Sequence, residues 1–138
     1  MDETKISLLL VDDDPDLLSA LDRTFRREGF RTIKAVSAEE ATSILRHYKV
    51  DAILCDNQMV GTSGTSFLAQ VKYDHPMISR FMLTGDISST QSWLLLNDIG
   101  VDGMFEKPCE PSLIVDAIHQ AMTVRDACMA QVIEQTLR

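Results

Sequence analysis

Short apolar runs alternate along the chain with segments whose apolar residues recur at helical spacing. The runs are nearly continuous, which is typical of strands covered on both faces in a parallel sheet. They predict five strands, at residues 6–11, 30–36, 51–55, 80–83 and 104–105. The segments between them predict helices that run from Pro15 until Gly29, from Ser37 past Leu45, over residues 65–73, from Ser88 or Ser89 through Leu96, and from Pro111 toward Arg138.

Several local signals support these helix limits. Pro15 suits a first helical turn and Gly29 a helix stop. Ser37 and Glu40 have the spacing of a capping box, in which the Ser side chain accepts a hydrogen bond from the third residue of the helix. These signals divide the chain into repeated strand–helix units.

Strands that alternate with helices in units of this length predict an α/β fold. Right-handed crossovers place the helices on both faces of a parallel sheet, so we expect a doubly wound, five-stranded sheet with an extended C-terminal helix. In such sheets the functional crevice lies at the carboxyl ends of the strands. The residues that end the strands should therefore meet in space.

The bulk composition describes one ordinary domain. The chain has 138 residues, of which 45% are hydrophobic and 25% charged, and its apolar runs fall short of the roughly 20 residues of a membrane span. The N-terminus lacks the pattern of a secretory signal, and three cysteines without metal-ligand spacing favour reduced thiols. The net charge of −8 argues against direct nucleic-acid binding. We expect a cytoplasmic protein without membrane contact.

The predicted strand ends carry a distinctive set of residues: Asp12, Asp13, Asp56, Thr84 and Lys107. Three carboxylates close together repel one another unless a cation neutralises them. An all-oxygen acidic cluster without His or Cys selects a hard ion, and Mg²⁺ is the usual choice beside a phosphoryl oxygen. The Lys ammonium and the Thr hydroxyl can hold other phosphoryl oxygens while an Asp carboxylate attacks phosphorus in line. The set therefore predicts phosphoryl transfer.

Four motifs stand at these strand ends in order: VDDDP, CDNQMVGTSG, MLTGD and FEKPCEP. Together they resemble the response-regulator receiver domain of two-component signalling, over roughly residues 5–122. The resemblance implies a flavodoxin-like fold and a phosphoacceptor in a phosphorelay. It leaves residues 123–138 as a C-terminal helical extension, either a linker or a dimerisation helix.

The resemblance also implies a role for each site residue. Asp56 matches the phosphoacceptor, Asp13 the direct metal ligand, and Asp12 the second acidic residue, which often reaches the metal through water. The backbone carbonyl of Gln58 would complete the protein ligands of Mg²⁺. Asp14 is interpreted instead as a helix N-cap or a first-turn residue.

The phosphoryl group has its own matching residues. Thr84 and Lys107 correspond to the hydroxyl and the lysine that bind it, and the family usually has a cis peptide between the residues aligned with Lys107 and Pro108. Gln58 and Asp86 match positions that tune hydrolysis of the acyl phosphate; a solvated-loop reading of both stays open.

Two positions depart from the family pattern. Val60 stands where proline is usual, and Met104 stands where most receivers carry Tyr or Phe. Methionine lacks the two well-separated positions of an aromatic ring, which puts the usual aromatic switch in doubt. Strand alternation points the neighbouring Phe105 to the other face.

The leading hypothesis is a phosphorylation-controlled signalling switch, not an enzyme in class, although it assists its own phosphorylation and dephosphorylation. A sensor histidine kinase or phosphotransfer protein would be the donor, and an unknown effector domain or protein the target. One alternative is a degenerate receiver that docks independently of phosphorylation. A second is a phosphatase like the haloacid dehalogenases, with Asp12 as nucleophile.

The C-terminal extension has a ragged apolar stripe of Met129, Val132 and Ile133, preceded by Arg125. A frayed extension and a dimerising or effector-linking helix both fit this pattern. Trp93 and residues 94–96 form a second apolar row, part of which is an interface candidate. An ending at Arg138 also fits a receiver excised from a longer protein.

Overall fold

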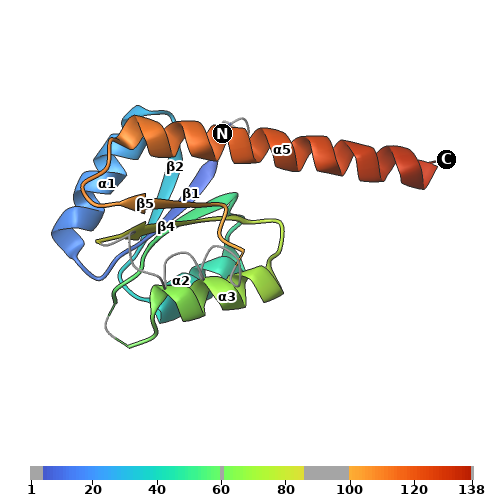
Figure 1. The fold of residues 1–138 in the computed structure, drawn as a ribbon. Coiled ribbons are helices and arrows are strands. Elements are labelled where there is room, and N and C mark those ends of the chain that lie inside the picture. Colours follow the sequence, from blue (N-terminus) through green and yellow to red (C-terminus); the bar gives the residue numbers. More distant parts are fainter. Residues whose placement is uncertain (1–4, 60, 86–99, 138) are drawn as a thin grey trace.

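The core of the protein is a five-stranded, all-parallel sheet in the order β2-β1-β3-β4-β5 (Figure 1). The computed structural model describes residues 5–59, 61–85 and 100–137. Its strands are β1 (Ser7–Val11), β2 (Arg31–Ala35), β3 (Ala52–Asp56), β4 (Ser79–Thr84) and β5 (Gly103–Glu106). The crossover from β2 over β1 to β3 reverses the strand order, which confirms the predicted doubly wound sheet.

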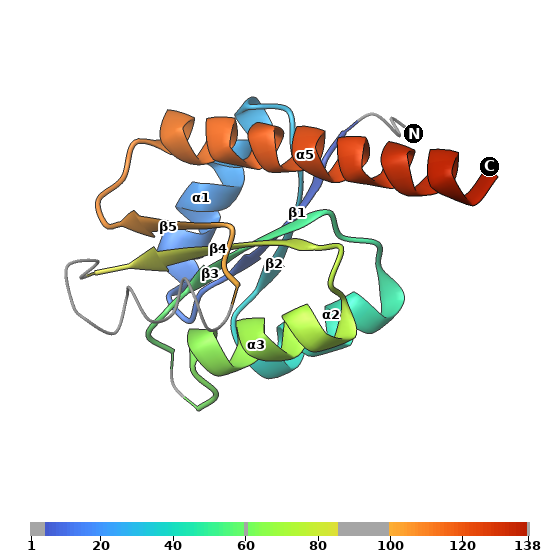
Figure 2. The same ribbon diagram turned by 45° about the vertical axis from the view of Figure 1, so that its right-hand side comes forward.

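The described helices cover both faces of this sheet. Figures 1 and 2 show α1 and α5 on one face and α2 and α3 on the other. Their bounds are α1 (Pro15–Arg27), α2 (Ala38–His47), α3 (Gly64–Asp74) and α5 (Pro111–Leu137). Each of these helices lies within one turn of its predicted limits.

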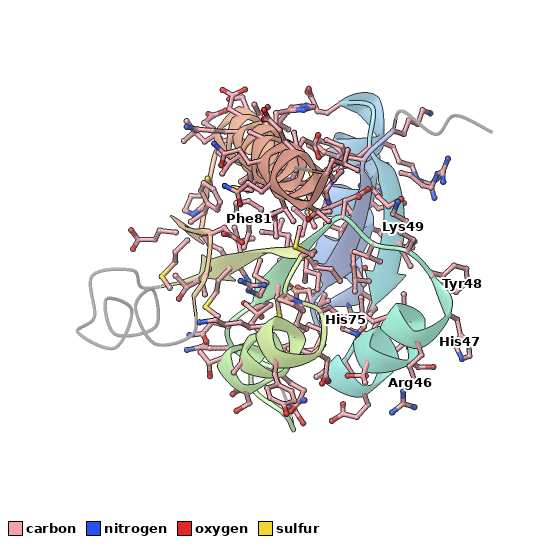
Figure 3. All side chains as sticks on the ribbon, turned by 90° about the vertical axis from the view of Figure 1, so that its right-hand side faces the viewer. Arg46, His47, Tyr48, Lys49, His75 and Phe81 are labelled. Atoms are coloured by element: carbon pink, nitrogen blue, oxygen red, sulfur yellow. The ribbon has the colours of Figure 1, made fainter. Side chains whose placement is uncertain are left out.

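Alternation along the strands divides the apolar core into two layers. Leu8 and Leu10 of β1 pack in the layer under α1 and α5, whereas Leu9 and Val11 pack in the layer under α2 and α3. Phe81 belongs to the first layer, and Figure 3 shows it on the α5 side of β4. β1 is buried on both faces, which accounts for its nearly continuous apolar sequence.

The predicted helix signals are present as hydrogen bonds. Asp14 is the N-cap of α1, and its side chain accepts from the backbone N–H groups of Asp16 and Leu17. Ser37 caps α2 by accepting from the backbone N–H of Glu40. Gly29 has φ of 93°, a left-handed conformation that favours glycine and ends α1.

The third strand is shifted by one residue from the prediction. It was expected at residues 51–55 and is observed at Ala52–Asp56, so Asp56 itself pairs within the sheet. Asp51 directly precedes the strand: its backbone bonds Ser7 and Ser79 of the neighbouring strands, and its side chain contacts the Ser7 N–H and Arg125. The predicted helix through Leu96, the apolar row from Trp93, and the positions Val60 and Asp86 lie outside the described residues.

Helix α5 is longer than the sheet that it covers. Its buried residues end at Met122, and Arg125 is tied to Asp51 where the helix leaves the sheet, with 3.2 Å between Nη1 and Oδ1. The rest of the helix extends beyond the domain for roughly 20 Å at 1.5 Å per residue (Figure 2). Among the described residues, no helix is both long and apolar enough to cross a membrane. The division into residues 5–122 and 123–138 stays a prediction.

Two identical substitutions in α5 test this division. Ile118 is fully buried and Ile133 is 54% exposed. We expect Ile118→Ala to lower the free energy of unfolding by about 2–5 kcal/mol, because it leaves a cavity between α5 and the sheet. Ile133→Ala should change it by about 0.5 kcal/mol or less. Urea denaturation followed by circular dichroism, at low protein concentration, measures both; equal losses would contradict a boundary near Met122.

Candidate functional site

Three carboxylates gather at the carboxyl ends of two adjacent strands. Asp12 and Asp13 follow β1, and Asp56 ends β3, which pairs with β1 in parallel up to Val11 and Cys55. One carboxylate oxygen from each of the three lies within 4.8 Å of those of the other two. Asp12 is 2% and Asp56 8% exposed, whereas Asp13 is exposed. The predicted acidic cluster is present, and most of it is shielded from water.

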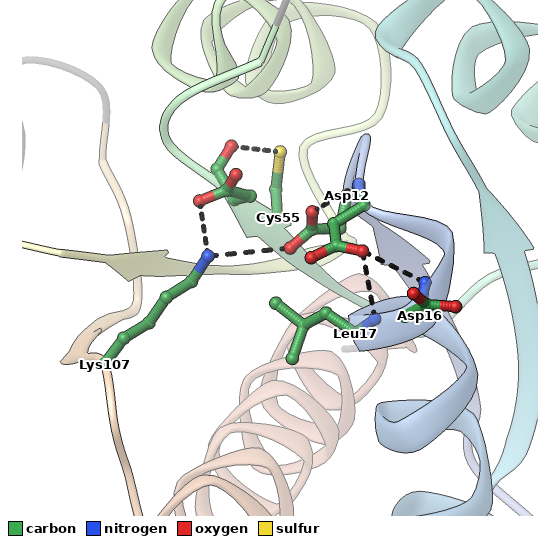
Figure 4. Close-up of polar contacts among 7 residues, drawn as sticks. Asp12, Asp16, Leu17, Cys55 and Lys107 are labelled. Carbon is green, nitrogen blue, oxygen red and sulfur yellow. Dashed lines mark hydrogen bonds and ion pairs between the residues drawn. The ribbon is translucent and has the colours of Figure 1, made fainter.

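Lys107 supplies the positive charge of this cluster. Its Nζ lies 3.1 Å from Oδ1 of Asp56 and 3.6 Å from Oδ2 of Asp12. Figure 4 marks these contacts of Lys107 with dashed lines. Its backbone N–H donates to the carbonyl oxygen of Thr84 at 2.7 Å, which fixes the residue beside the end of β4. The peptide between Lys107 and Pro108 is cis, as the resemblance implied.

Backbone groups hold Asp12 in place on two sides. Its N–H donates to the carbonyl oxygen of Ala35 at the end of β2, at 3.1 Å. Its Oδ1 accepts from the N–H of Asp14 at 2.9 Å, where the chain turns into α1. The other carboxylate oxygen, Oδ2, therefore faces Lys107.

Burial and the charges of the cluster shift the pKa values of Asp12 and Lys107. Burial raises the pKa of Asp12, and the neighbouring carboxylates of Asp56 and Asp13 add to the rise, against the N–H of Asp14 and the charge of Lys107. Partial burial alone would lower the pKa of Lys107, but its contacts with Asp56 and Asp12 outweigh that effect and raise it. Lys107 therefore stays protonated, and its single positive charge does not balance the three carboxylates of the cluster.

The donor set fits a hard divalent cation. All three side chains offer carboxylate oxygens, and the ionised form of Asp12 is disfavoured without additional positive charge. A cation among these oxygens would remove that penalty. The cluster therefore has both the ligands and the electrostatic demand for a metal ion.

The other predicted site residues have different surroundings. Thr84 is buried as the last residue of β4, directly beside the Lys107 backbone. Gln58 lies in the loop after β3, two residues from Asp56, and is exposed. Its carbonyl as a metal ligand stays a prediction.

The two apolar residues of β5 face opposite ways. Met104 packs in the layer under α2 and α3, and Phe105 in the layer under α1 and α5. The predicted alternation is confirmed. The family's aromatic position is thus filled by a methionine packed against the core.

Sequence reasoning missed Gly64, which touches the backbone of Asp56. It read residues 60–64 as a glycine-containing loop, whereas Gly64 is the first residue of α3. The only sign of this contact in the sequence is a glycine near the start of a helix. A glycine there does not indicate which other part of the backbone lies against it.

Known proteins match the chain over most of its length. Residues 8–119 match the family model of the response regulator receiver domain. The hydrogenase transcriptional regulatory protein HoxA of Cupriavidus necator is 34% identical over 122 residues, covering 88% of this chain and 25% of HoxA. The transcriptional regulatory protein GlrR of Escherichia coli is 30% identical, covering 83% of this chain and 26% of GlrR. The chain spans about a quarter of the length of these two relatives.

A solved structure shows the same fold. The CheY-like response regulator receiver domain protein from Methanospirillum hungatei superposes with a TM-score of 0.83 at 22% identity, covering 90% of this chain and 98% of that protein. The strand order of the sheet, the acidic cluster at its strand ends and the family match over residues 8–119 all indicate the same family. The chain belongs to the response-regulator receiver domain family.

Proposed function

We propose that this receiver accepts a phosphoryl group on Asp56 from a sensor histidine kinase or phosphotransfer protein, in a Mg²⁺-dependent reaction. The observation that carries the proposal is the ion pair of Asp56 with Lys107, at 3.1 Å, inside a cluster of two further carboxylates. A strand-end carboxylate with only a capping role would not need a half-buried lysine ammonium group beside it.

The carboxylates of Asp12, Asp13 and Asp56, with the backbone carbonyl of Gln58, would hold the Mg²⁺ ion. When bound, the ion neutralises the acidic cluster and withdraws charge from a phosphoryl oxygen. The protein side chains supply the remaining electrostatic stabilisation. Lys107 already lies within hydrogen-bond distance of the attacking carboxylate.

Chemistry at Asp56 needs one bond to form and one to break. A carboxylate oxygen of Asp56 attacks phosphorus as the P–N bond of a phosphohistidine breaks, and the electron pair leaves with the imidazole nitrogen. Lys107 then moves its ion pair from the Asp56 carboxylate to a phosphoryl oxygen, and the Thr84 hydroxyl donates to another. Asp56 pairs with Leu83 in β4, and Thr84 follows Leu83. The backbone N–H of Lys107 donates to the carbonyl oxygen of Thr84, which keeps Lys107 at the same edge of the sheet.

Phosphorylation adds negative charge at the strand ends, and the shift of Lys107 and Thr84 changes the population of a partner-binding conformation. The target would be an effector domain or protein, and such signalling places the chain in the cytoplasm without nucleic-acid or membrane contacts of its own. The receiver is then a phosphoacceptor that assists its own phosphorylation and dephosphorylation.

The phosphatase alternative is not favoured. It leaves Asp56 without a role, although this carboxylate forms the shorter of the two Lys107 contacts. The docking alternative rests on Met104 alone, whereas all of the acidic and basic residues of the site are in place.

We also propose that the C-terminal extension forms a homodimer. Met129, Val132 and Ile133 lie on the same face of α5 as Ile118 and Met122, which are buried against the sheet. That face continues beyond the domain with its apolar side chains 43–56% exposed. Pairing with the same face of a second copy would cover them.

The first experiment is phosphorylation by acetyl phosphate, followed by intact mass. With Mg²⁺ the wild type should gain one phosphoryl group, and Asp56→Asn should gain none because the attacking oxygen is lost. Asp16→Asn, an exposed carboxylate in the first turn of α1, serves as the matched control and should behave as the wild type. An adduct that persists in Asp56→Asn and vanishes in Asp12→Asn would instead support the phosphatase.

Asp12→Asn should stabilise the metal-free protein at pH 7. The pKa of Asp12 is raised above its ordinary value of 3.8, so ionisation opposes folding at pH values above the raised pKa. The advantage of the Asn variant should disappear as the pH falls below 3.8, where the wild-type carboxyl is protonated in both the folded and the unfolded state. Urea denaturation across this range measures it.

Mg²⁺ should reverse the order of these two proteins. The wild type should gain about 2.7 kcal/mol at 100 times the dissociation constant, and Asp12→Asn should gain less because a ligand carboxylate is lost. Asp16→Asn is again the control. An equal gain in wild type and Asp12→Asn would exclude Asp12 from the metal site.

The homodimer is tested by sedimentation. Ile133→Glu places a charge on the apolar face and should lower the association constant at least tenfold, about 1.4 kcal/mol. Gln135→Glu adds the same charge on another face of the helix and should leave association unchanged. A wild type that is monomeric at every concentration would contradict the dimer.

A further inference from the structure

Gly64 lies against the backbone of Asp56. A Cβ atom at Gly64 would stand 2.3 Å from the carbonyl oxygen of Asp56, 3.1 Å from its carbonyl carbon and 3.0 Å from Cα of Asn57. Distances under 3.0 Å essentially never occur for real Cβ atoms, and the atoms approached here are backbone. Only glycine permits this approach of α3 to the end of β3.

The peptide groups around Asp56 are fixed from several directions. The Cys55 thiol donates to the Asp56 carbonyl oxygen, with Sγ at 3.3 Å. The N–H of Asn57 donates to the carbonyl oxygen of Leu83 in β4 at 3.1 Å, and the N–H of Gly64 donates to the carbonyl oxygen of Asn57 at 3.2 Å. The backbone that carries the Asp56 side chain is therefore held by β4 and α3 together.

Helix α3 has little freedom to retreat from this contact. Phe67, Leu68 and Val71 are buried against the sheet within the layer that also contains Cys55 and Met82. A methyl group added at Gly64 must therefore either lift these side chains out of a close-packed core or displace the backbone of Asp56. The second route moves the carboxylate relative to its partners.

Small displacements matter at this carboxylate. One of its oxygens lies 3.1 Å from Nζ of Lys107, and one carboxylate oxygen each from Asp56, Asp12 and Asp13 lie within 4.8 Å of one another. A misplacement of about 1 Å in such a site can slow a reaction about 100-fold.

We propose that Gly64 is a positioning residue for phosphorylation: by letting α3 contact the Asp56 carbonyl group, it sets the place of the Asp56 carboxylate relative to Asp12, Asp13 and Lys107. This inference rests on the proposed function of Asp56. It assigns to α3 the task of aligning the acceptor, in addition to covering the sheet.

The test is Gly64→Ala, phosphorylated by acetyl phosphate at varied Mg²⁺ concentration. We expect the rate constant per folded molecule to fall about 10-fold to 100-fold, and half-saturation to require more Mg²⁺. A merely structural defect would lower the folded fraction and leave both quantities unchanged. Rates equal to the wild type would overturn the inference.

Gly103→Ala is the matched control. A Cβ atom there would meet the Phe81 ring at 2.9 Å, so the substitution also crowds the core, but it touches no part of Asp56. Its rate constant per folded molecule should equal that of the wild type. Slowing as large as that of Gly64→Ala would show that core crowding alone is responsible.

A second readout needs neither metal nor phosphodonor. In the metal-free protein, the backbone amide NMR signals of Asn57 and Asp13 should move in Gly64→Ala and stay in place in Gly103→Ala. Unmoved signals in Gly64→Ala would refute the positioning role, whether or not the wild type accepts a phosphoryl group. A wild type that accepts no phosphoryl group would refute the proposed function and leave the NMR test of Gly64 valid.

If Gly64→Ala does not fold, Phe67→Leu replaces it. This variant loosens the anchor of α3 without adding volume at Asp56, because Phe67 lies in the first turn of the helix and is buried against the sheet. We expect slower phosphorylation per folded molecule and a shifted Asn57 signal. A rate and a signal identical to the wild type would again overturn the inference.

Discussion

The structure depends on holding three carboxylates together at one edge of the sheet. One carboxylate oxygen each from Asp12, Asp13 and Asp56 lie within 4.8 Å of one another. The side chains of Asp12 and Asp56 are almost fully buried. Their mutual repulsion favours separation, so the strand register must oppose it. The parallel pairing of β1 with β3, and the bonds of Asp12 to Ala35 and Asp14, supply that constraint.

Lys107 makes this arrangement both stable and responsive. Its ammonium group reaches two of the carboxylates from the end of β5, while its backbone is bonded to Thr84. A compact charge on a flexible stem can exchange one oxygen partner for another at small cost. In the proposed reaction, the contact that offsets repulsion in the unmodified protein would be available to a phosphoryl group on Asp56, which would join stability to switching.

Much of the fold and the site could be predicted because strand ends of a parallel sheet meet at one edge. That rule alone brings Asp56 to Lys107, although 51 positions separate them. The contact of Gly64 and the pair of Asp51 with Arg125 could not be predicted, since each depends on how closely two elements approach in three dimensions. The side chain of Asp51 accepts from the Ser7 N–H and pairs with Arg125, contacts that depend on the approach of β1 and α5 to the start of β3.

Methionine at position 104 changes how a signal can leave the site. Met104 of β5 pairs with Met82 of β4. Its side chain packs in the core layer that contains Cys55 and the buried side chains of α3. A flexible thioether adapts to its surroundings instead of choosing between two ring positions. The proposed movement of Thr84 would then reach β5 through the backbone, where the Lys107 N–H donates to the Thr84 carbonyl oxygen at 2.7 Å. A backbone link carries displacement without a rotamer change, so the loss of the aromatic ring removes one route of transmission and leaves the one that joins Thr84 and Lys107, the two residues proposed to bind the phosphoryl group.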